Sequence, residues 1–158
     1  MSSIPPASIK LTELGIPHRV FRHAGQVTSL EQAASERGQR VGQVVRSIVF
    51  RLGEGCFAMV LMAGAAQISW PALRAHFGQP RLTMADPSEV QAVTGYRVGT
   101  VSPIGLKNPI PILADESLLA EDELSMGSGE RNAAIILRRE DLFKAIGELE
   151  TGSFASEG

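Results

Sequence analysis

Two neighbouring stretches near the middle of the chain are rich in the apolar residues Val, Ile, Phe and Met, a pattern that predicts β-strands. These stretches are "VVRSIVFRL" (44–52) and "CFAMVLMAG" (56–64), and the Gly-Glu-Gly sequence between them predicts a hairpin turn that pairs them antiparallel. Two later runs, 110–115 and 133–138, are apolar almost throughout, which is typical of strands covered on both faces. A brief strand is also expected at 18–23.

Five segments carry helix signals, and they interleave with the predicted strands. They span 5–17, 28–38, 69–78, 86–95 and 140–149. The first predicts a helix that places Ile9, Leu11 and Leu14 on one side. The second has Thr28 as its N-cap and Glu31 three residues on, which together form a capping box. The third and fourth each combine a capping residue with a proline in the first turn, and each stops at a glycine.

The order of these elements predicts a mixed α/β (α+β) fold, in which helices pack around a mixed sheet. At 158 residues, of which 44% are hydrophobic, the chain is long enough for one domain with a sizeable core. We expect residues 1–150 to form that domain and residues 151–158 to be a disordered tail.

Charge and cysteine content narrow the possible functions. The net charge of −2 and the pI of about 5.9 exclude a broadly basic protein that binds nucleic acid through surface charge alone, so any such contact must be local. The single cysteine, Cys56, cannot form an internal disulfide and is expected to be an inert core thiol. A cytoplasmic protein is expected, because no N-terminal stretch resembles an export signal and the apolar runs are too short to cross a membrane. No metal site is expected, because His18, His23 and His76 lack metal-ligand spacing.

Arg46 is the most unusual residue of the predicted hairpin. Period-2 alternation places it with Val44, Ile48 and Phe50 on an otherwise apolar face, and places Ser47 on the opposite face. An unpaired buried charge is costly, so the guanidinium must either reach past the end of the strand or enter a polar pocket. Two interpretations stay open: an edge arginine with a structural carboxylate partner, or an anchor for an anion or a carbonyl group in a cleft.

Two glycine-rich segments and one carboxylate are further candidates. The segment Gly95–Leu106, "GYRVGTVSPIGL", could turn tightly and bring bare N–H groups to a ligand, but it could equally be a long surface connection. The second segment, "GSGERN" (127–132), is interpreted as a plain strand-entry turn. Asp115 follows an apolar strand and is either the cap of a helix at "ESLLA" or a site carboxylate, and we favour the cap.

Five segments in the same order are similar to those of the YbaK/ProX family of free-standing aminoacyl-tRNA deacylases, which are relatives of the editing domain of bacterial prolyl-tRNA synthetases. They are "LGIPHRVFRH", "GQVVRSIVFR", "TGYRVGTVSPIG", "PILADESLL" and "GSGERNAAIILRREDL". The most specific element is the GxxxP motif, which runs here from Gly99 to Pro103. The resemblance implies a barrel-like, largely antiparallel sheet surrounded by short helices. It also implies trans-editing, in which the ester of a small amino acid on the 3′-terminal adenosine of tRNA is hydrolysed without a cofactor or metal.

The resemblance further implies which residues act. The GxxxP loop would line the aminoacyl pocket and turn its backbone N–H groups toward the ester. Arg46 stands where the family has a lysine, and it keeps the positive charge but cannot act as a base. The catalytic residues would be Arg46, Gly99, Thr100 and Val101, and the substrate-binding residues would be His23, Thr28, Ser47, Ser102, Pro103, Gly105 and Asp115.

Two other functions stay open. The lysine-to-arginine exchange favours a non-catalytic module that binds tRNA ends or a synthetase. A small-molecule hydrolase unrelated to tRNA is the other. The implied partners are the acceptor end of aminoacyl-tRNA and an aminoacyl-tRNA synthetase, with no membrane, and the chain is expected to be a monomer or a weak homodimer.

Overall fold

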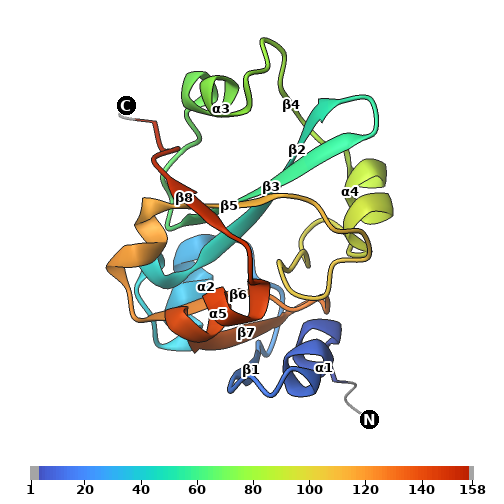
Figure 1. Cartoon of the computed structure of the whole chain (residues 1–158). Helices are drawn as coiled ribbons and strands as arrows, with labels where there is room; N and C mark the ends of the chain where they lie inside the picture. Colours follow the sequence, from blue (N-terminus) through green and yellow to red (C-terminus); the bar gives the residue numbers. More distant parts are fainter. Residues whose placement is uncertain (1–3, 157–158) are drawn as a thin grey trace.

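The computed structural model describes residues 4–156, which form two β-sheets with short helices around them (Figure 1). The three-stranded sheet has the order β1 (Arg19–Arg22), β7 (Ala133–Arg138), β6 (Glu123–Gly127), and all its pairs are antiparallel. The five-stranded sheet has the order β4 (Thr83–Met84), β2 (Val45–Gly53), β3 (Cys56–Ala63), β5 (Ile112–Asp115), β8 (Glu150–Gly152). Within it β5 runs parallel to both β3 and β8.

The predicted mixed and largely antiparallel α/β fold is confirmed, including the hairpin of β2 and β3. The strands form two sheets rather than one closed barrel, and an isolated bridge between Val44 and Ser125 links them. Because β4 pairs with β2 only at Phe50 and Arg51, most of the outer edge of β2 has no partner strand. This open edge lies beside the cavity described below.

The helices are α1 (Pro6–Glu13), α2 (Leu30–Arg37), α3 (Trp70–Phe77), α4 (Pro87–Thr94) and α5 (Arg139–Ile146), with 3-10 turns at η1 (Val41–Gln43) and η2 (Glu116–Ala120). The predicted caps of α3 and α4 are confirmed: the side chains of Ser69 and Asp86 accept from backbone N–H groups three residues on. The predicted cap of α2 is wrong by one residue. Ser29 is the N-cap, while the N–H and hydroxyl of Thr28 both donate to the side chain of Gln32.

Of the three apolar residues predicted to share one side of α1, only Leu11 is buried. Ala7 and Leu11, four residues apart, point into the core together with Ser8, whereas Ile9 is 49% exposed and Leu14 is 46% exposed. The helical period of 3.6 residues separates Ile9 from the Ala7–Leu11 stripe, and Leu14 lies beyond the last helical residue.

Two hydrophobic clusters cover the two faces of the five-stranded sheet. The first lies between the sheets and includes Val45, Val49 and Leu61 from the hairpin and Leu124 and Ile135 from the other sheet. The second lies under α3 and includes Phe50, Val60, Met62, Leu73 and Phe154. The sheet is therefore apolar on both faces, and polar side chains on β2 need a specific reason to be there.

The end of the chain is ordered as far as the structure describes it, so the prediction of a disordered tail is wrong for residues 151–156. Strand β8 pairs with β5, and Phe154 is only 3% exposed because its ring completes the second cluster. The Phe154 N–H also donates to Asp115 Oδ1 over 2.7 Å. Residues 157–158 lie outside the described part.

Cys56 is exposed, not in the core as predicted, because it is the first residue of β3 beside the hairpin turn. Within residues 4–156 no helix is long and apolar enough to span a bilayer.

Candidate functional site

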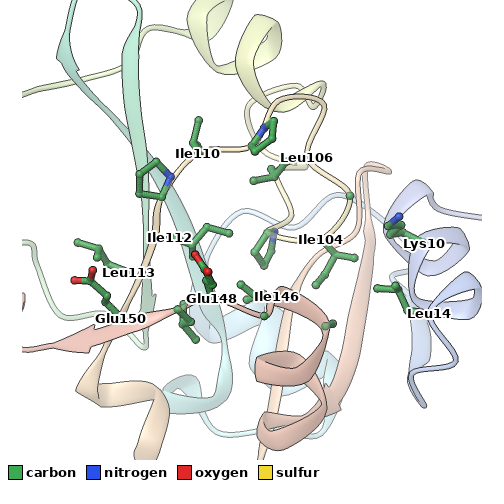
Figure 2. A pocket seen from close by; sticks show the side chains of 17 residues that line it. Lys10, Leu14, Ile104, Leu106, Ile110, Ile112, Leu113, Ile146, Glu148 and Glu150 are labelled. Atoms are coloured by element: carbon green, nitrogen blue, oxygen red, sulfur yellow. The ribbon is translucent and has the colours of Figure 1, made fainter.

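The larger of two cavities in the described part of the chain is lined by no described residues that form a convergent set of reactive groups. It has a volume of about 1130 Å³ and lies between α1, the segment 103–113 and the end of α5. Figure 2 shows Lys10 and Leu14 at one end and Glu148 and Glu150 at the other, with isoleucine and leucine side chains between them. The three ionisable groups are exposed and far from forming a cluster. The chemistry therefore has to be sought elsewhere.

The second cavity, which we call the β2-edge cavity, has a volume of about 670 Å³ and lies along the open edge of β2. Segments from α4, the glycine-rich loop 98–101, the end of β6 and the start of β7 complete its wall. Its polar lining residues are His23, Gln26, Arg37, Arg46, Ser47, Arg131 and Asn132, and none of the described residues that line it is Asp or Glu. A cationic cavity in a chain of net charge −2 is suited to an anionic or electron-rich ligand.

Arg46 is fixed by neutral groups. Its side chain lies on the face of Ile48 and Phe50, as the alternation predicted, and its Nε–H donates to the carbonyl oxygen of Gly64 over 2.9 Å. A second N–H donates to the carbonyl oxygen of Ala66. The structural carboxylate partner that one interpretation of the sequence gave Arg46 is absent among the described residues. Three of the five N–H donors of the guanidinium have no acceptor there. Burial lowers the pKa of Arg46, but the group stays a cation at neutral pH.

Ser47 offers unpaired polar groups to the same cavity. The carbonyl oxygen of Val44 accepts from the N–H of Gly64, so the even-numbered residues of β2 are the ones bonded to β3. The N–H and C=O of Ser47 therefore face the open edge. Its Oγ is buried without a hydrogen-bond partner in the described part of the chain.

The glycine-rich loop presents bare backbone donors. Gly99 has φ of 95°, a left-handed conformation that favours glycine, and it lines the β2-edge cavity together with Val101. Neither the Gly99 nor the Val101 N–H has a partner within residues 4–156. The N–H and hydroxyl of Thr100 both donate to the carbonyl oxygen of Arg97, over 2.9 and 2.8 Å, so Thr100 closes the turn and has no free donor.

The segment 127–132 is more than the plain turn that was predicted, because it supports this loop. A Cβ on Gly127 would stand 2.1 Å from the carbonyl oxygen of Val101, so only glycine allows the two backbones to pack this closely. The Gly129 N–H donates to the carbonyl oxygen of Thr100 over 2.8 Å. The ring of Tyr96 packs on Gly129, and its hydroxyl donates to the carbonyl oxygen of Ile104. Burial of this ring raises the pKa of Tyr96.

His23 lies at the cavity wall with both ring nitrogens engaged. Its Nδ1 lies 2.6 Å from Glu36 Oε1, and its Nε2 accepts from the Nε–H of Arg37 over 3.1 Å. The hydrogen bonds from Gln32 and His23 lower the pKa of Glu36, which makes it the acceptor of this pair. Arg37 also donates to Ser125 Oγ over 3.0 Å. The ring of His23 is therefore a fixed spacer between Glu36 and Arg37.

The predicted site residues divide into three groups. The β2-edge cavity brings together His23, Arg46, Ser47, Gly99 and Val101. Pro103 and Gly105 line the larger cavity instead, on the other side of the same loop. Thr28, Thr100, Ser102 and Asp115 line neither cavity. Ser102 is buried and accepts from the Ile104 N–H, and Asp115 caps η2 as predicted by accepting from Ser117.

Four polar residues of the cavity were missed in the sequence, and Gln26, which precedes α2, is one of them. Arg37 stands at the end of a helix, and Arg131 and Asn132 belong to the turn before β7. The asparagine at position 132 was the available signal for a special turn, because asparagine tolerates positive φ better than most residues. In the structure Asn132 has φ of 62°. Within residues 4–156 no three His, Cys, Asp or Glu side chains converge in a way that could hold a metal ion.

Known proteins resemble the chain over most of its length. Residues 24–145 match the model of the aminoacyl-tRNA editing domain family. The chain is 26% identical over 138 residues to the Multifunctional Ser/Thr-tRNA deacylase ProXp-y of Escherichia coli (strain K12), which covers 85% of this chain and 82% of that protein. It is 27% identical over 114 residues to the proline–tRNA ligase of Thermosipho melanesiensis, covering 72% of this chain but only 20% of the ligase.

Solved structures agree with these matches. A crystal structure described as a candidate trans-editing enzyme for prolyl-tRNA synthetase has a TM-score of 0.88 and 28% identity with this chain. The match covers 98% of this chain and 99% of that chain.

Proposed function

Because the chain belongs to the aminoacyl-tRNA editing domain family, we propose that it hydrolyses the ester between a wrongly attached amino acid and the 3′-terminal adenosine of tRNA, acting in trans. The observation that carries the proposal is the pair of unpaired N–H donors of Gly99 and Val101 at a cavity without carboxylates. Such a reaction meets a physical need. A synthetase pocket rejects an amino acid that lacks one methylene by only about 1–3 kcal/mol, so a second site has to remove the errors.

The reaction follows from these donors. The ester carbonyl oxygen would lie at the N–H groups of Gly99 and Val101, and a water molecule would attack the carbonyl carbon. The two N–H groups would stabilise the oxyanion that forms, and the bond between the carbonyl carbon and the ribose oxygen would then break. In net terms, water gives its hydroxyl to the acyl group and one proton to the departing oxygen. Arg46, with three N–H donors left, would hold the ester or the terminal nucleotide.

No side chain in the cavity is free to act as a strong base. Both nitrogens of His23 are engaged, and Arg46 stays charged. Aminoacyl esters are already labile, so lowering the barrier by about 4–6 kcal/mol, which is about 10³- to 10⁴-fold in rate, is sufficient. Backbone donors and positioning can supply an effect of this size.

The hydroxyl of Ser47 supports a small amino acid with a polar side chain as the substrate. A buried hydroxyl without a partner is unfavourable by about 1–3 kcal/mol, and a substrate hydroxyl would relieve this once the Ser47 side chain turns its Oγ into the cavity. A site that is arranged to bond a hydroxyl rejects analogues that lack one. We therefore expect seryl or threonyl esters to be cleaved faster than alanyl esters. The related deacylase named for Ser- and Thr-tRNA supports this choice.

The test is a panel of tRNAs charged with alanine, serine, threonine, cysteine or proline. Wild-type protein should release a small amino acid, Arg46→Ala should lose most of this activity, and Arg46→Lys should keep a substantial part. Ser47→Ala should reduce the preference for hydroxyl-bearing esters over alanyl esters. If Arg46→Ala deacylates like the wild type, the proposed site is wrong. If no charged tRNA is hydrolysed but tRNA ends still bind, the chain is a binding module.

The similarity to part of a proline–tRNA ligase supports a working relation with a synthetase that charges the same tRNA. Such substrates are found in the cytoplasm, which is where we expect the protein to act. The monomer or weak homodimer stays a prediction, to be measured by analytical ultracentrifugation.

A further inference from the structure

None of the three arginines of the β2-edge cavity forms a direct ion pair within residues 4–156. Arg37 and Arg46 donate only to neutral acceptors, and Arg131 has no side-chain partner within residues 4–156. The six arginines that form ion pairs all lie outside the cavity: Arg19, Arg22, Arg40, Arg51, Arg138 and Arg139. Arg74, Arg81 and Arg97 also form no ion pair within residues 4–156, but the β2-edge cavity is where three such arginines line one space.

Arg37 is the most informative of the three. Its guanidinium is held by His23 Nε2 and Ser125 Oγ, both uncharged, and burial lowers its pKa. The carboxylate that acts on Arg37, Glu36, is bonded to the other ring nitrogen of His23 and not to the guanidinium itself, so a direct anionic partner is left for a ligand to supply. Its hydrogen bonds fix the side chain before that ligand arrives.

A chain of contacts connects Arg37 to the turn before β7. The His23 N–H donates to the carbonyl oxygen of Asn132 over 2.8 Å, and His23 Nε2 accepts from Arg37. Asn132 is the one non-glycine residue with positive φ in the described part of the chain, and its side-chain amide has no partner there. Strained residues of this kind often lie at ligand sites. Arg37, Arg131 and Asn132 therefore form one corner of the cavity.

We propose that this corner is a subsite for the phosphodiester group on the 5′ side of the terminal adenosine. The inference rests on the proposed function, because that phosphate is the anion nearest to the ester on the same nucleotide. The ester itself is uncharged and uses the N–H donors of Gly99 and Val101, so it does not account for the charges of Arg37 and Arg131. The two subsites meet at Gly127, which packs on Val101 and leads into the turn that carries Arg131.

The experiment measures binding without hydrolysis. The probe is an uncharged acceptor-stem RNA with a single-stranded 3′ end, and a second probe carries a neutral methylphosphonate at the last linkage. Arg131→Ala removes a charge that has no contact to lose, so the variant should fold normally. Arg138→Ala is the control, because it removes the same charge from the far end of β7, the strand that follows the Arg131 turn, outside the cavity.

With the natural RNA, we expect Arg131→Ala to bind about 5- to 10-fold more weakly than the wild type, and its slope of log affinity against log salt to be smaller by about 0.7. Arg138→Ala should match the wild type. With the neutral linkage, the difference between wild type and Arg131→Ala should fall below about twofold, because the contact is already lost.

Equal salt slopes for Arg131→Ala and Arg138→Ala would overturn the subsite, and so would an undiminished effect of Arg131→Ala on the neutral-linkage RNA. Failure to bind the RNA at all would also overturn it. Failure of the proposed function looks different. In that case charged tRNA would not be hydrolysed, while the effects of Arg131→Ala and of the neutral linkage on binding would remain.

Discussion

Replacing Gly127 by alanine tests whether the rate of deacylation depends on the position of the loop 98–101. The new Cβ would stand 2.1 Å from the carbonyl oxygen of Val101, whereas real Cβ contacts essentially never fall below 3.0 Å, so the two backbones must separate by about 0.9 Å. The Val101 N–H would shift together with the Val101 carbonyl oxygen, because both belong to the loop 98–101. A misplacement of about 1 Å can reduce a rate by about 10²-fold.

The same substitution should destabilise the fold only in part. Overpacking of this kind costs about 1–3 kcal/mol, which for a domain of this size lowers Tm by roughly 2–12 °C. Single-turnover deacylation at 25 °C and thermal unfolding, measured on the same samples, separate the two effects. Gly53→Ala is the matched control, because its Cβ would meet nothing within 4 Å. A folded Gly127→Ala protein with wild-type turnover would refute the argument that this contact positions the N–H donors.

Three further outcomes are expected. Gly99→Ala should lower turnover at least tenfold while Tm falls by only a few degrees, because its Cβ meets open space but φ of 95° strains any other residue by about 1 kcal/mol; equal turnover would mean that the loop is merely a connection. Phe154→Ala should lose about 3–5 kcal/mol of stability and lower Tm by roughly 6–20 °C in calorimetry, and an unchanged Tm would contradict its place in the core. Hydrogen bonds from Gln32 and His23 lower the pKa of Glu36. The stability that they give the folded state is therefore present above pH 4.5 and is lost as the pH falls through the lower pKa that Glu36 has in the folded protein. Tm of Glu36→Gln should therefore fall less steeply in acid than that of the wild type, and parallel curves would exclude this contribution.

Features fixed by neighbours in the sequence were predictable. The caps at Ser69 and Asp86 and the hairpin turn depend on residues within four positions, and the structure has them as expected. The GxxxP motif from Gly99 to Pro103 likewise identified the family from the sequence alone. The buried face of α1 was not predictable in the same way, because several apolar residues competed and only packing decides which ones are buried.

The missed features are all non-local. Strand β8 exists because Phe154 completes a cluster formed by residues about 40 to 100 positions earlier, and nothing in the segment 150–154 reveals these partners. The same holds for the cavity. Arg46 and Gly99 were identifiable from a strand pattern and a motif. Arg37 and Arg131 are brought to the same cavity only by the tertiary contacts of His23 with Arg37 and with Asn132. The need for glycine at position 127 could not be recognised either, because it arises from close packing against the backbone of Val101.

The open edge of β2 also bears on self-association. Unpaired N–H and C=O groups on a strand edge can recruit a strand from another molecule, which is a common route to aggregation. Here the free stretch is short, because β4 covers one end and the bridge from Val44 to Ser125 covers the other. The cations along the cavity would repel the same cations of a second copy. The charges that suit the site to RNA would thus also keep the bare edge from pairing, and variants that remove them should be watched for precipitation at high protein concentration.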